Sequence, residues 1–68
     1  MDAATYDSEA HRHADLAARF YREGGEAWVR AEHQLARTLF DRGAKEIARS
    51  AESRAIAEAL KRAQEPKS

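Results

Sequence analysis

Apolar residues recur every three or four positions along most of the chain, and charged residues fill the positions between them. Near the N-terminus this apolar line passes through Ala10, Ala14, Ala17 and Phe20. No segment shows the alternation of a strand, and only five residues are β-branched. Oppositely charged residues repeatedly stand four positions apart, which is typical of an exposed helical face. The pattern therefore predicts an all-α fold.

Two adjacent glycines, Gly24 and Gly25, interrupt this pattern. Each disfavours a helix interior by about 1 kcal/mol relative to alanine, and glycine commonly follows the last turn of a helix. We therefore expect a helix over about residues 7–23, a turn at 24–25 and a second helix over about 26–64. An uninterrupted helix is the alternative, because the three-to-four spacing of apolar residues continues through the glycines.

The expected helix ends rest on local signals. Asp7 or Ser8 is expected to cap the first helix, because either side chain can accept hydrogen bonds from its free amide groups. Gly43 could kink or break the second helix, but ion-pair spacings bridge it and favour continuity. Residues 65–68 are expected to be a frayed tail, with Pro66 ending the helix.

The second helix offers two apolar faces at different heights. At about 100° per residue, one face is formed by two adjoining groups: Trp28, Leu35 and Leu39 cluster together, and Val29, Ala36, Phe40 and Ile47 form the stripe beside them. Ile56, Leu60 and Ala63 form a separate line, turned by roughly 140–180° from Ile47. We therefore predict a helical hairpin that pairs with a second copy in a four-helix arrangement, with Ile56, Leu60 and Ala63 at the dimer interface.

The composition also favours self-association. The chain has 68 residues, and 16 of its 29 apolar residues are alanine, so little large apolar surface is present for a core. A chain of this size forms one small, marginal domain, and small domains gain stability from disulfides, metals or oligomerisation. Cysteine is absent, so disulfides are excluded.

The charge balance and the lack of long apolar segments limit the kinds of partner that the chain is expected to bind. The formal net charge is zero, with a net of −3 over residues 1–33 and +3 over residues 34–68, an asymmetry that suits antiparallel packing. Because positive and negative charges balance, we do not expect strong electrostatic binding to the phosphate backbone of a nucleic acid. No uncharged run exceeds four residues, so no membrane span is expected, and we expect a cytoplasmic protein.

The sequence contains few combinations of residues that could form a catalytic or metal-binding site. No serine stands in a glycine-flanked elbow, and the proximity of Ser8 to His11 lacks a third orienting group. His11 and His13 point in nearly opposite directions on a helix, and pairs such as Glu9 with His13 supply only two metal ligands. We expect neither catalysis, nor a cofactor, nor a metal.

The aromatic residues are the strongest pointer to function. Tyr21, Arg22, Trp28 and Arg30 surround the expected turn, and Tyr, Trp and Arg are enriched at binding hot spots. Trp28 could instead belong to the core with the two phenylalanines. We predict a non-enzymatic module that docks on another protein through these four residues.

A small helical nucleic-acid-binding or transcription-regulating protein is the alternative. Basic residues give the second half some positive character, although Glu46 and Glu52 lie among them. These basic residues are Arg37, Arg42, Lys45, Arg49 and Arg54.

In size, Ala- and Arg-rich composition and expected hairpin form, the chain resembles small accessory proteins of bacteriophages that infect high-GC bacteria. That class includes anti-activators that bind host regulators such as quorum-sensing receptors. The resemblance implies an inhibitor that covers a surface of a regulator in the host cytoplasm. It carries no motif and assigns no residue.

Overall fold

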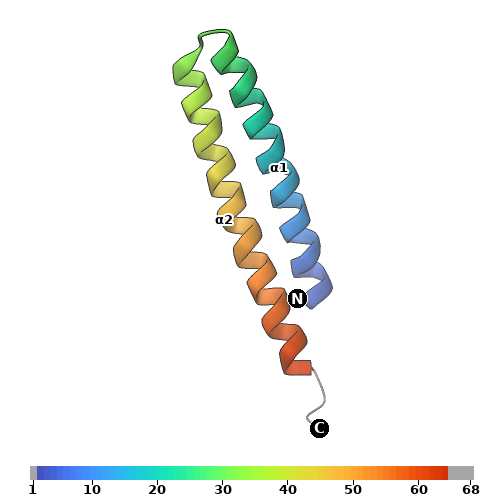
Figure 1. Cartoon of the computed structure of the whole chain (residues 1–68). Helices are drawn as coiled ribbons and strands as arrows, with labels where there is room; N and C mark the ends of the chain where they lie inside the picture. Colours follow the sequence, from blue (N-terminus) through green and yellow to red (C-terminus); the bar gives the residue numbers. More distant parts are fainter. Residues whose placement is uncertain (1, 65–68) are drawn as a thin grey trace.

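The computed structural model describes residues 2–64 and shows two antiparallel α-helices (Figure 1). Helix α1 spans Ala3–Val29 and helix α2 spans His33–Gln64. The prediction of an all-α helical hairpin is confirmed. The hairpin is a rod with extents of 58 × 18 × 13 Å, so side chains outside the seam between α1 and α2 lie at or near the surface.

The seam between the helices is built from small residues at every seventh position. Each of these residues is buried, so the two backbones approach each other closely along the whole hairpin. In α1 they are Ala3, Ala10, Ala17 and Gly24, and in α2 they are Ala36, Gly43, Ser50 and Ala57. A seven-residue repeat of this kind keeps the same stripe of each helix facing its neighbour.

A buried hydrogen bond crosses the seam in its half farther from the turn. The Ser50 hydroxyl donates to the backbone oxygen of Ala10 over 2.8 Å. The short serine side chain makes this bond while keeping the helices close. Among residues 2–64, no large side chain is fully buried, so the hairpin has a narrow seam in place of a wide apolar core.

Helix α1 begins earlier than its sequence signals predicted. The Asp2 carboxylate caps the helix, accepting hydrogen bonds from the Thr5 backbone amide at 3.0 Å and from the Thr5 hydroxyl at 2.9 Å. The bond from the Thr5 amide lowers the pKa of Asp2. The predicted caps Asp7 and Ser8 are therefore wrong, because an earlier residue already caps the free amide groups.

The predicted turn at Gly24 and Gly25 is also wrong, because both glycines lie inside α1. Gly24 is buried against Phe40 of α2, and a β-carbon on Gly24 would lie 2.7 Å from Phe40 Cε1. The glycine thus makes room for an aromatic ring. Nothing lies within 4 Å of a β-carbon built on Gly25.

The chain turns instead at Arg30, Ala31 and Glu32. Ala31 has a φ of 62°, in the left-handed region. The Ala31 amide donates to the Trp28 oxygen and the Glu32 amide donates to the Ala27 oxygen, each over 2.9 Å. These two bonds form a Schellman motif, which ends a helix through one left-handed residue. An alanine fills the position that glycine usually takes.

Helix α2 continues through Gly43, as the bridging ion-pair spacings favoured. It begins at His33, so the predicted boundaries of about 7–23 and 26–64 are replaced by those above. The predicted tail at residues 65–68, including Pro66, lies outside the described residues.

Candidate functional site

Aromatic rings and glycines interlock across the seam in a reciprocal way. Phe40 of α2 lies over Gly24 of α1, while Tyr21 of α1 lies over Gly43 of α2. A β-carbon on Gly43 would be 3.2 Å from the Tyr21 ring. The two rings also contact each other, with centroids 6.1 Å apart and planes inclined by 32°. Each ring is therefore held by the opposite helix.

A second aromatic pair lies next to the turn. The rings of Trp28 and His33 have centroids 4.2 Å apart and planes inclined by 32°. Trp28 follows Tyr21 by seven residues, and His33 precedes Phe40 by seven, so both pairs lie along the same side of the seam. Ile47 continues this line on α2.

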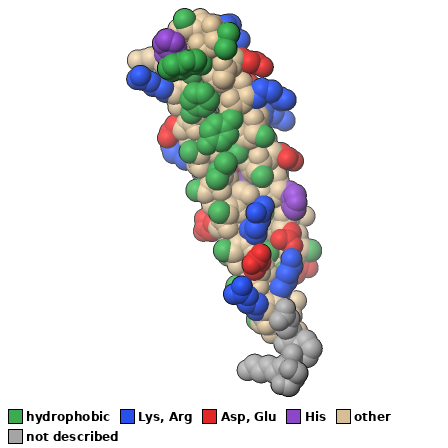
Figure 2. Space-filling model, in the orientation of Figure 1, with side chains coloured by type: hydrophobic (Ala, Val, Ile, Leu, Met, Phe, Trp, Pro, Cys, Tyr) green, Lys and Arg blue, Asp and Glu red, His purple; other side chains and the backbone are tan. Residues whose placement is uncertain are grey.

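We call this surface the aromatic face and define it by Tyr21, Trp28, His33, Phe40 and Ile47. Tyr21 is 38% exposed, Trp28 50% and Ile47 51%, although these are the large apolar side chains that a core would bury. Hydrophobic side chains gather between the helices in the half nearer the turn, and charged side chains become prominent towards the open end (Figure 2).

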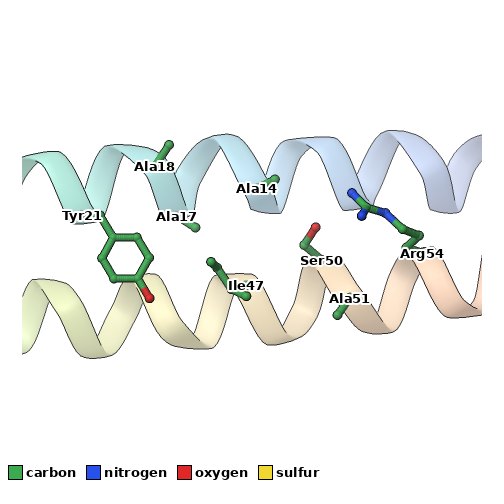
Figure 3. A pocket seen from close by; sticks show the side chains of 8 residues that line it. All are labelled: Ala14, Ala17, Ala18, Tyr21, Ile47, Ser50, Ala51 and Arg54. Atoms are coloured by element: carbon green, nitrogen blue, oxygen red, sulfur yellow. The ribbon is translucent and has the colours of Figure 1, made fainter.

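A hollow of about 390 Å³ lies on this face, between Tyr21 at one end and Arg54 at the other (Figure 3). Its sides come from both helices and consist mainly of small side chains, which is why the surface is concave there. The lining residues are Ala14, Ala17, Ala18, Tyr21, Ile47, Ser50, Ala51 and Arg54.

The four residues predicted to bind a partner are only partly brought together. Tyr21 and Trp28 share the aromatic face, and Trp28 is half-exposed, so it is not a core residue. Arg22 is exposed one position, or about 100°, away from Tyr21. Arg30 begins the loop and donates to Glu32 over 2.9 Å, a hydrogen bond that raises the pKa of Arg30.

The three residues predicted for a dimer interface differ in exposure. Ile56 is 36% exposed and Ala63 is exposed, whereas Leu60 is half-buried. None of the three lines the hollow on the aromatic face. Ile56 and Ala63 are therefore more accessible to a second chain than Leu60 is.

A polar cluster joins the two helices away from the hollow. His13 Nδ1 lies 2.5 Å from a carboxylate oxygen of the buried Glu46, and Arg49 donates to the other oxygen over 2.8 Å. Glu9 lies 3.7 Å from His13 Nε2 and also pairs with Arg12. The hydrogen bond from His13 is the main cause that lowers the pKa of Glu46, and the charge of Arg49 adds to it.

Sequence reasoning misses the pairing of His13 with Glu46. Glu9 stands four positions before His13 and is an evident neighbour on a helix, whereas Glu46 stands out only as an acidic residue among basic ones. A pairing across 33 positions becomes visible only once the register of the helices is known. The signal that could supply the register is the seven-residue repeat of small residues.

The basic residues considered for nucleic-acid binding are partly neutralised. Arg42, Lys45 and Arg49 line a second hollow of about 240 Å³ together with Phe20 and Glu46. Lys45 lies 3.3 Å from an Asp41 carboxylate oxygen, and Arg49 pairs with Glu46. Lys45 and Arg49 therefore each have a carboxylate partner within the hairpin.

No protein-family model, curated protein or solved structure matches the chain. Within residues 2–64, no three histidine or acidic side chains converge as metal ligands would. Neither α1 nor α2 combines the length and apolar character that crossing a membrane requires.

Proposed function

We propose that the protein is a small, non-enzymatic binding module whose aromatic face docks on another protein. The observation that carries this proposal is the exposure of Tyr21, Trp28 and Ile47 on one side of the seam. Contiguous apolar surface of this kind marks interaction sites, and tyrosine and tryptophan are enriched among hot-spot residues.

The fixed geometry of the face supports the same proposal. Gly43 and Phe40 hold the Tyr21 ring, and His33 stacks on Trp28. Side chains that are already ordered lose less conformational entropy on binding, so more of the contact energy contributes to affinity.

The resemblance to phage anti-activators extends the proposal to inhibition. In this form, the aromatic face covers a surface of a bacterial regulator in the host cytoplasm and blocks its activity. Binding is tested before inhibition, because the protein can block a regulator's surface only if it binds there.

Capture of a partner by the tagged full chain tests the binding step. Trp28→Ala should weaken binding to the purified partner about thirtyfold, since truncating a hot-spot residue costs about 2 kcal/mol or more. Val29→Ala is the matched control, because Val29 is the next residue and is 85% exposed but lies outside the face. Equal binding by both variants, with unchanged helicity, would contradict the proposal.

We also propose that the hairpin pairs with a second copy through Ile56, Leu60 and Ala63. The absence of a fully buried large side chain among residues 2–64 supports this, because a small domain without a wide core gains stability by association. Sedimentation at micromolar concentration should give about twice the chain mass, and Ile56→Glu should reduce it to that of a single chain. Leu60→Glu is a poorer test because Leu60 is half-buried in the hairpin itself. A parent chain that stays monomeric contradicts the pairing.

A further inference from the structure

We propose that the hollow on the aromatic face receives a large apolar side chain from a partner helix, and that Arg54 pairs with a carboxylate beside that side chain. This inference rests on the proposed function, because it names the partner chemistry for the same face. The shape of the hollow and the charge at its end carry it.

The shape favours a helix. The hollow lies between two antiparallel helices, and Ala14, Ala18 and Ala51 at its sides are too small to hold a third helix away. Its volume of about 390 Å³ lies within the roughly 300–1,000 Å³ of typical ligand pockets. An amphipathic helix laid in a groove, with apolar residues spaced three, four or seven apart, is a common mode of recognition.

The positive charge of Arg54 at one end of the hollow indicates a partner that carries a negative charge nearby. Arg54 is exposed and makes no ion pair with any residue in the 2–64 range, whereas Lys61 nearer the open end is paired with Asp7 over 2.8 Å. The Ser50 hydroxyl already donates to Ala10. The Arg54 side chain extends from α2 towards α1 (Figure 3). A carboxylate is the group that matches a guanidinium in charge and in geometry.

Synthetic peptides provide the probe. An alanine-based peptide of about 18 residues is long enough to form a helix and carries leucines at positions i, i+3 and i+7 with one adjacent glutamate. Added to the full chain, it should shift the amide NMR signals of the residues lining the hollow. Replacing its glutamate by lysine should weaken binding about tenfold, and Arg54→Gln should remove that preference.

A second test fills the hollow with a larger side chain. Ala51→Leu should weaken peptide binding about tenfold or more, because the added side chain occupies the space that the leucine enters. Ala59→Leu is the matched control, since Ala59 is an exposed alanine on the same helix that does not line the hollow. Peptide binding that is equal in both variants, or no binding by the parent, overturns the inference.

The same variants separate this inference from the proposed function. If Trp28→Ala loses capture of the natural partner while Ala51→Leu retains it, the aromatic face is supported as the binding surface. The hollow then does not receive a partner side chain, and the inference is overturned. If Ala51→Leu converts a dimer to a monomer, a second copy occupies the hollow and the partner-helix inference is overturned.

Discussion

The ring of Phe40 packs against the backbone of Gly24, so closely that a β-carbon on Gly24 would lie 2.7 Å from Cε1 of the ring. Gly25, the next residue, has nothing within 4 Å of the same position. Two adjacent glycines in one helix therefore have different roles, and only the first is required by packing.

Alanine substitution should separate the two glycines. Gly25→Ala should stabilise the fold by about 0.5–1 kcal/mol, because alanine is the better helix former and meets no neighbour. Gly24→Ala should be less stable than Gly25→Ala by about 1–3 kcal/mol, because its β-carbon displaces the ring. Urea denaturation measures both. A Phe40→Leu background should reduce the difference, and equal effects of the two substitutions would show that the ring does not restrict Gly24.

The left-handed residue in the turn gives a second prediction. Ala31 has a φ of 62°, and an L-residue in this region is disfavoured by about 1–2 kcal/mol. Ala31→Gly should stabilise the hairpin by up to about 1 kcal/mol after the greater flexibility of unfolded glycine is included. Ala44→Gly, inside α2, should have the opposite sign. Thermal unfolding of the two variants checks this, and a loss of stability in Ala31→Gly would contradict the Schellman geometry.

The small residues of the seam give a third prediction. Ala57 is fully buried, so Ala57→Leu should destabilise the hairpin by about 1–3 kcal/mol by forcing the helices apart. Leucine and alanine are both good helix formers, so the exposed control Ala48→Leu should change stability by less than about 0.5 kcal/mol. Denaturant midpoints compare the two variants. Similar midpoints would mean that the seam tolerates large residues.

The polar cluster gives a prediction about pH. The folded-state pKa of Glu46 is lowered, chiefly by the hydrogen bond from His13, so its carboxylate stabilises the fold above the unfolded-state pKa. This contribution should be lost as the pH falls through the ordinary glutamate range and then through the folded-state value. Denaturation between about pH 3 and pH 7 should therefore show a weaker acid dependence in Glu46→Gln than in the parent. The exposed control Glu52→Gln should keep the parent's dependence, and an unchanged slope in Glu46→Gln would contradict the assignment.

Local composition determined the secondary structure of this protein. The alanine, arginine and glutamate content, the scarcity of β-branched residues and the spacing of opposite charges all favour helix, and residues 3–29 and 33–64 are helical. Continuity through Gly43 was also predictable, because ion-pair spacings extend across it. These features depend on neighbours three or four positions apart, which the sequence displays directly.

Only the tertiary structure decided where the chain turns and what the glycines do. Gly24 and Gly43 carry the local signal of a helix end, but each accepts a ring from the opposite helix, and the turn falls on Ala31. The exposure of Tyr21 and Trp28 and the pairing of His13 with Glu46 likewise depend on the register between α1 and α2. Register is set by the packing of two small-residue stripes against each other, and contacts between residues that are distant in sequence override the weak preferences of single residues.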